Sequence, residues 1–144
     1  MTQAKETIGF IGLGLMGHGM AKNIVENGYP LTVMGHRNRK PIEDMVQRGA
    51  TEVKSPKEIA ESSSIVFLCV TGSSQVEEIV RGESGLKAGL AKGSVVVDCS
   101  TAEPNSTLAL AAELAEMGVD YVDAPLGRTP KEAWEGALDT MVGA

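Results

Sequence analysis

Residues 8–28 read IGFIGLGLMGHGMAKNIVENG, and this stretch decides the fold. It opens on a short apolar run, Ile8–Ile11, which is typical of a buried strand. After a glycine-rich turn, Met16, Met20 and Ile24 recur every four residues, which places them on one face of a helix. The glycine that closes the stretch stands where helices commonly end. The stretch therefore predicts a strand, a tight turn and a helix, in that order.

The glycines of the turn have the spacing G-x-G-x-x-G. Between a strand and a helix, the first glycine permits the tight turn, the second lets the backbone approach a pyrophosphate, and the third lets helix and strand pack closely. Unpaired N–H groups at the helix N-terminus favour a bound anion. The alternative to a pyrophosphate site is that the three glycines serve only the turn. The predicted dinucleotide site is made by Gly12, Leu13, Gly14, Leu15, Met16 and Gly17.

The rest of the chain alternates short apolar runs with helical periods. Further strands are expected at 31–34, around residue 53, and at 65–70, 94–98, 119–123 and 137–143. Helices are expected at 42–46, from Ser55–Pro56 onward, at 75–80 and at 104–117. Strands that alternate with helices form βαβ units. Residues 1–144 are therefore predicted to form one α/β domain, a Rossmann-type doubly wound and mainly parallel sheet with helices on both faces.

Composition limits the classes of partner. The formal net charge is −6, which argues against nucleic acid or an anionic membrane as the main partner. No apolar run approaches the ~20 residues of a membrane-spanning helix. Cys69 and Cys99 lie in apolar runs without metal-ligand spacing, so we interpret them as reduced core thiols. Two such thiols and no secretory signal indicate the cytoplasm.

The end of the second predicted strand indicates which dinucleotide is bound. NAD sites place a carboxylate there to hold the ribose 2′-hydroxyl, whereas this chain has the run His36 to Lys40 and no carboxylate before Glu43. Arginine offers a planar fork that matches phosphate oxygens. We therefore predict that Arg37, Asn38 and Arg39 hold an adenosine 2′-phosphate, which favours NADP over NAD. A solvated basic loop is the alternative.

Four segments resemble the β-hydroxyacid dehydrogenases, a family that includes 3-hydroxyisobutyrate dehydrogenase and tartronate semialdehyde reductase. They are residues 8–23, the run Asp98-Cys-Ser-Thr-Ala-Glu-Pro104, the run Asp123-Ala-Pro-Leu-Gly-Arg-Thr129, and residues 136–143. The resemblance implies reversible hydride transfer between NADP(H) and a small 3-hydroxyacid or its semialdehyde. It also implies that a full-length protein is a homo-oligomer.

The same resemblance implies site residues beyond the glycine turn and the His36 to Arg39 loop. For the cofactor these are Val70, Thr71, Val76 and Thr101, and for the acid substrate they are Ser100, Gly127, Arg128 and Thr129. Each has a structural alternative: Ser100 or Thr101 could cap the following helix, and Arg128 could be a surface ion-pair partner. We interpret Asp98 and Asp123 as strand-end hydrogen-bonding residues rather than acids or bases.

Two departures from the family pattern matter. Gly127-Arg-Thr129 stands where Ser-Gly-Gly is usual and is similar to the 3-sulfolactaldehyde reductases of the family, so we hypothesise that Arg128 favours a sulfonated or doubly charged substrate. The family's catalytic lysine, in Gly-x-x-Lys-x-x-x-Asn on a later helix, does not occur in these 144 residues. We therefore expect no catalytic residue in this chain and no turnover by it alone. Two alternatives to a dehydrogenase domain are a stand-alone NADP-binding or sensing module and a domain that binds another nucleotide.

Overall fold

A computed structural model describes residues 6–35, 38–101, 103–126 and 129–138. Its strands and helices alternate along the chain, with a single 3₁₀ turn, η1, as the exception. The strands are β1 (Ile8–Ile11), β2 (Leu31–Met34), β3 (Thr51–Val53), β4 (Ile65–Leu68), β5 (Val95–Asp98) and β6 (Asp120–Asp123). The helical segments are α1 (Leu15–Glu26), α2 (Lys40–Gln47), α3 (Pro56–Ser62), α4 (Ser73–Arg81), η1 (Leu86–Ala88), α5 (Pro104–Ala115) and α6 (Pro130–Glu135).

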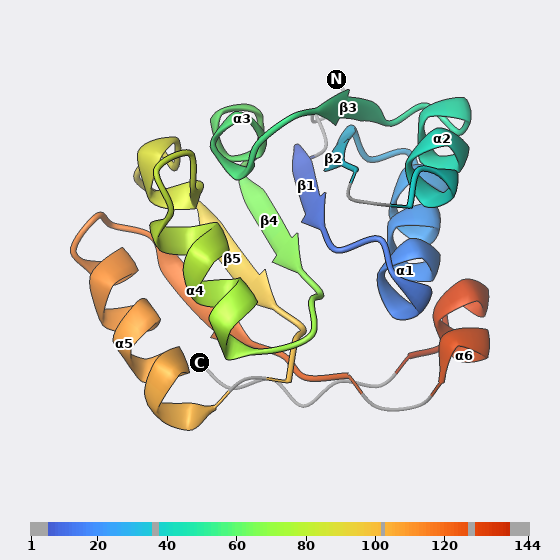
Figure 1. Cartoon of the computed structure of the whole chain (residues 1–144). Helices are drawn as coiled ribbons and strands as arrows, with labels where there is room; N and C mark the ends of the chain where they lie inside the picture. Colours follow the sequence, from blue (N-terminus) through green and yellow to red (C-terminus); the bar gives the residue numbers. More distant parts are fainter. Residues whose placement is uncertain (1–5, 36–37, 102, 127–128, 139–144) are drawn as a thin grey trace, which may run out of the picture.

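The six strands form one sheet in the order β3-β2-β1-β4-β5-β6, and every neighbouring pair is parallel. β1 therefore lies between β2 and β4, and the chain winds outward from it in both directions. In Figure 1 the sheet runs through the middle, with α3, α4 and α5 on one side and α1, α2 and α6 on the other. The predicted Rossmann-type doubly wound sheet is confirmed.

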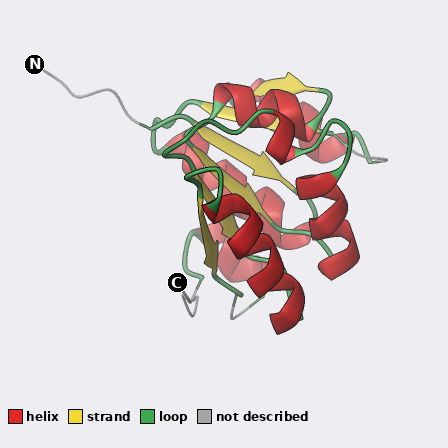
Figure 2. Cartoon of the chain, turned by 90° about the vertical axis from the view of Figure 1, so that its left-hand side faces the viewer, coloured by secondary structure: helices red, strands yellow, loops and turns green. Residues whose placement is uncertain are grey.

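Successive residues of a strand point to opposite faces of the sheet, and each face has its own core. Ile11, Val66 and Leu68 pack with buried residues of α3, α4 and α5. Phe10 packs with α1 and α2, and its ring stacks on Phe67 with centroids 5.8 Å apart. Figure 2 shows the strands enclosed between these two helical layers. Within the described ranges, none of the helices has both the length and the apolar character needed to span a bilayer.

The start of α3 follows the sequence prediction in detail. Ser55 lies at the N-cap with extended backbone, and its Oγ accepts a hydrogen bond from the Glu58 N–H at 3.2 Å. Pro56 occupies the first helical position, where a missing N–H costs no hydrogen bond. The Glu58 carboxylate accepts in turn from the Lys54 N–H at 2.7 Å. The first bond satisfies a backbone donor that the helix N-terminus leaves unpaired, and the second ties the residue before the N-cap to the first turn.

Helix α6 was not predicted from the sequence, and it lies on α1. Asn23 of α1 donates through Nδ2 to the carbonyls of Ala133 and Trp134, at 2.9 and 3.2 Å. Lys22 donates to the Trp134 carbonyl at 3.0 Å and lies over the indole ring. A side chain far away in the sequence thus caps the last turn of α6. Most of the strand predicted at 137–143 falls outside the described residues, and 137–138 are not in a strand.

Gly19 permits this contact, since a Cβ there would lie 2.6 Å from the Ala133 carbonyl carbon and the Trp134 nitrogen. We expect Gly19→Ala to displace α6, because overpacking costs about 1–3 kcal/mol. Alanine also favours the helical conformation of α1 by about 1 kcal/mol relative to glycine. This gain should offset the loss of the α6 contact, so the free energy of unfolding should change little. Trp134 is the chain's single tryptophan, so its fluorescence should shift to the red and become easier to quench. Gly72→Ala, whose Cβ meets nothing nearer than 3.6 Å, is the control, and equal spectra for both variants would contradict this account.

Candidate nucleotide-binding site

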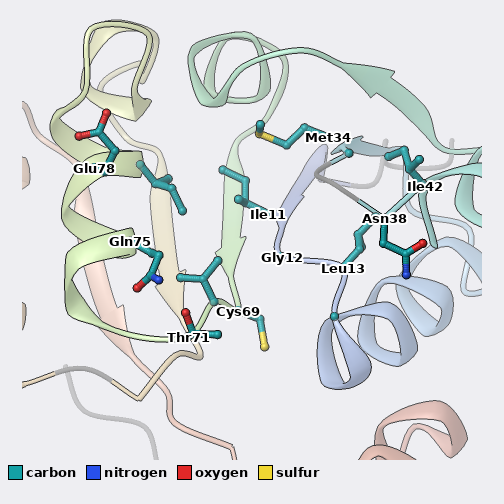
Figure 3. A pocket seen from close by; sticks show the side chains of 14 residues that line it. Ile11, Gly12, Leu13, Met34, Asn38, Ile42, Cys69, Thr71, Gln75 and Glu78 are labelled. Atoms are coloured by element: carbon teal, nitrogen blue, oxygen red, sulfur yellow. The ribbon is translucent and has the colours of Figure 1, made fainter. Parts of the chain in front are cut away.

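A cleft of about 610 Å³ opens at the carboxyl ends of β1 and β4. The strand order reverses there, since the chain winds toward β2 and β3 on one side and toward β5 and β6 on the other. Open α/β sheets bind ligands in such a crevice. Figure 3 shows Gly12 and Leu13 between two walls, one formed by α4 with Gln75 and Glu78, the other by the β2 end with Met34 and Asn38.

The glycine turn forms the middle of the cleft through contacts between backbone atoms. Gly12 has a φ of +106°, and a Cβ there would lie 2.0 Å from the Cys69 carbonyl oxygen. A Cβ on Gly17 would lie 1.8 Å from the Gly12 carbonyl oxygen. Gly14 differs, because a Cβ there would meet nothing within 4 Å. The fold therefore requires Gly12 and Gly17, whereas it leaves open space in front of Gly14.

That open space faces the N-terminus of α1. Gly14 is the N-cap residue, no side chain caps the helix, and its first turn has no acidic residue. The first N–H groups of a helix lack intrahelical partners, and the helix dipole favours negative charge there. Leu15, one residue further, has 81% of its surface exposed. The geometry suits an anion that approaches the backbone closely, as the predicted pyrophosphate site requires.

On the α4 side of the cleft, the structure agrees with two of the three residues predicted along the cofactor and differs at the third. Val70 and Thr71 line the cleft as expected. Val76, also predicted along the cofactor, is fully buried in the core beneath α4 and has no surface for a ligand. The helix instead presents Gln75, Glu78 and Ile79. This set follows an i, i+3, i+4 pattern, so helical periodicity counted from Gln75 could have identified it.

At the β2 end, Asn38 lines the cleft, and its Oδ1 accepts a hydrogen bond from the Lys40 N–H at 3.1 Å. Arg39 lies beside it but is already paired. Its Nη1 donates to Glu52 Oε2 at 2.6 Å, and its Nη2 donates to Oε1 at 3.0 Å. The sequence prediction missed Glu52, which lies on the edge strand β3. His36 and Arg37 lie outside the described residues.

A buried polar network connects β5 and β6 next to the cleft. Asp98 is completely buried, accepts the Ser100 N–H at 2.9 Å through Oδ1, and accepts the Tyr121 hydroxyl through Oδ2. Burial, followed by the nearby Asp98 carboxylate, raises the pKa of Tyr121 well above its ordinary value, so the phenol stays protonated and donates. Burial and Asp98 also raise the pKa of Asp123. The interpretation of Asp98 as a strand-end hydrogen-bonding residue is confirmed.

The site residues predicted after β5 and β6, Thr101 for the cofactor and the others for the substrate, differ in exposure. Ser100 is 2% exposed, and its Oγ accepts a hydrogen bond from the Val70 N–H at 2.9 Å, which links the loops after β4 and β5. Thr101 and Thr129 are exposed, and the Thr129 hydroxyl donates to Glu132. The N-cap of α5 is Glu103, so neither Ser100 nor Thr101 caps that helix. Gly127 and Arg128 lie outside the described residues.

The two cysteines are free thiols, and Cys69 lines the cleft. Burial raises the pKa of Cys69 to about 11 and that of Cys99 to about 12, so both are protonated at neutral pH. Buried Cys99 agrees with the interpretation as a core thiol, whereas Cys69 is only partly buried and packs at the edge of the core. Among the described residues, no three His, Cys, Asp or Glu side chains are grouped so that they could hold a metal ion.

Comparison with known proteins adds to this geometry. Residues 7–144 match the family described as the NAD binding domain of 6-phosphogluconate dehydrogenase. The chain is 39% identical over 139 residues to 2-hydroxy-3-oxopropionate reductase of Escherichia coli (strain K12), covering 94% of this chain and 46% of that protein. It is 33% identical over 136 residues to 3-sulfolactaldehyde reductase of the same strain, with 94% and 45% covered.

A solved structure, Psf3 in complex with NADP⁺ and 2-OPP, aligns with a TM-score of 0.87 at 31% identity, covering 94% of this chain and 48% of that one. The chain thus spans about half the length of the relatives it matches. The resemblance to hydroxyacid dehydrogenases inferred from the four segments is confirmed for this half.

The glycine contacts predict that alanine destabilises the fold much more at Gly17 than at Gly14. Gly17→Ala should lower the free energy of unfolding by about 3 kcal/mol, since the new Cβ collides with a backbone carbonyl and the turn must open. Gly14→Ala should lower it by less than about 1 kcal/mol, the usual effect of a poorer N-cap residue. Urea denaturation followed by circular dichroism measures both. Equal losses would show that Gly14 is as necessary to the fold as Gly17.

Proposed function

The chain belongs to the family described as the NAD binding domain of 6-phosphogluconate dehydrogenase, and we propose that it binds a nicotinamide dinucleotide and prefers NADP. The observation that carries the proposal is Gly14. It lies at the N-terminus of α1 and at the strand-order reversal, and apart from its chain neighbours no atom of the described residues lies within 4 Å of the position its Cβ would take. A pyrophosphate fits that space because its oxygens can accept the free N–H groups of α1.

The rest of the cleft suits the two ends of a dinucleotide. Apolar side chains such as Ile11, Met34 and Val70 give its walls surface for flat rings. The cationic run from His36 to Lys40 replaces the carboxylate of an NAD site, which favours the 2′-phosphate of NADP. The solved relative in complex with NADP⁺ supports the same choice.

Calorimetric titration of the chain with NADPH and with NADH tests the proposal. We expect tighter binding of NADPH, and we expect the double variant Arg37→Ala, Arg39→Ala to lose that preference while NADH binding changes little. Gly14→Ala should weaken both cofactors about ten-fold or more with the fold intact, because a Cβ blocks the approach of the pyrophosphate to the backbone. Absence of binding by the unmodified chain would contradict the proposal.

For the longer protein, we propose reversible hydride transfer between NADP(H) and a small 3-hydroxyacid or its semialdehyde. The cofactor, when bound, supplies or accepts the hydride. We propose that exposed Thr101, after β5, lies near the nicotinamide and that exposed Thr129, after β6, contacts the acid substrate, while buried Ser100 holds the loops after β4 and β5 together. The chain holds no lysine in the family's Gly-x-x-Lys-x-x-x-Asn pattern, so alone it should not turn over substrate. A cytoplasmic location and a homo-oligomeric longer protein belong to the same proposal.

Arg128 is proposed to select the substrate's acid group. The full-length enzyme with Arg128→Gly should lose its preference for a sulfonated or doubly charged aldehyde by about ten-fold or more in kcat/KM, because a charge-assisted contact is lost. Activity toward a singly charged semialdehyde should change much less. Steady-state kinetics with both aldehydes checks this, and an unchanged substrate ranking would contradict the role of Arg128.

A further inference from the structure

The ion pair between Arg39 and Glu52 lies in a hollow of about 480 Å³ lined by Gly35, Arg39, Glu52, Val53 and Lys54. Gly35 also lines the nucleotide cleft, so the hollow and the cleft adjoin at the end of β2. A Cβ on Gly35 would lie 2.5 Å from Arg39 Nη1, which shows that the guanidinium rests against the strand end. The pair therefore occupies the rim of the cleft at its predicted adenosine end.

The pairing uses the same atoms that would bind a phosphate. Both Nη atoms of Arg39 donate to Glu52, one to each carboxylate oxygen. Arginine recognises carboxylate and phosphate through this same two-pronged geometry. Their mutual hydrogen bonds raise the pKa of Arg39 and lower that of Glu52, so both groups are charged at neutral pH. Among the residues that the structure describes, the charge of Glu43 also raises the pKa of Arg39, and the charge of Lys54 also lowers that of Glu52.

We propose that Glu52 sets the cofactor preference by occupying Arg39 in place of the 2′-phosphate. The inference rests on the proposed NADP site. In the chain without cofactor, Glu52 holds the guanidinium at the strand end. NADP must displace the Glu52 carboxylate before its 2′-phosphate can bind Arg39. The displaced carboxylate then lies near the bound phosphate. NAD has no 2′-phosphate and leaves the pair intact.

The size of the effect follows from exposure. The two side chains are 52% and 33% exposed, so water weakens the pair and makes exchange possible. Glu52 should therefore reduce NADPH affinity without abolishing it. We expect Glu52→Gln to bind NADPH about three- to ten-fold more tightly, since the single charge that both competes for Arg39 and repels the phosphate is removed. NADH affinity should differ from that of the unmodified chain by less than about two-fold, because NADH has no 2′-phosphate to bind Arg39.

Titration calorimetry of the chain, Glu52→Gln, Arg39→Ala and the double variant forms a complete cycle. The gain from Glu52→Gln should become clearly smaller when Arg39 is already Ala, because the carboxylate then has no guanidinium to withhold and only its repulsion of the phosphate remains. Glu43→Gln is the matched control. It removes the same charge from a residue whose carboxylate acts on the Arg39 guanidinium through its charge, and it should change NADPH affinity by less than about two-fold. Thermal melts should show all variants folded.

The outcomes separate this inference from the proposed function. If the unmodified chain prefers NADPH but Glu52→Gln leaves its affinity unchanged, or matches Glu43→Gln, the inference is wrong and the proposed function stands. A selective loss of NADH affinity in Glu52→Gln would make Glu52 a ribose ligand, which also overturns it. If the unmodified chain binds neither cofactor, the proposed function fails and the inference fails with it.

Discussion

The structure depends on the close approach of three backbone segments around the turn after β1. Gly12 lies against the carbonyl of Cys69 at the end of β4, and Gly17 of α1 lies against the carbonyl of Gly12. Neither contact has room for a side chain. These two contacts bring the first helix onto the first strand and the first strand next to the fourth. The cleft and the exposed helix N-terminus exist because of that arrangement.

The sequence predicted most of the elements because their signals are local. Apolar runs marked the strands, and Ser55-Pro56 marked the start of α3 through a hydrogen bond that spans three residues. Helix α6 could not be predicted in this way, because its six residues are stabilised by Asn23 and Lys22 from the opposite end of the chain. A short helix has too few hydrogen bonds of its own to leave a strong local pattern.

The site was predictable to a similar degree. Gly12 to Gly14 of the glycine turn, Val70, Thr71 and Asn38 line the cleft as expected, because a motif and strand ends fix their places. Val76 was assigned through the same resemblance as Val70 and Thr71, but it lies within α4 and the structure buries it. The Arg39–Glu52 and Asp98–Tyr121 pairs join residues on different strands or loops, so only the packed sheet reveals them.

The strand order has a consequence for how such a domain can diversify. The Arg39–Glu52 pair, at the proposed adenosine end, lies beside β2 and β3, whereas the Asp98–Tyr121 pair, near the proposed substrate side, joins β5 and β6. The two pairs lie on opposite halves of the sheet, with the glycine turn after β1 between them. Substitutions that alter cofactor choice can therefore accumulate without disturbing the buried Asp98–Tyr121 support, and the reverse also holds. The two ends of the cleft can in this way change independently on one scaffold.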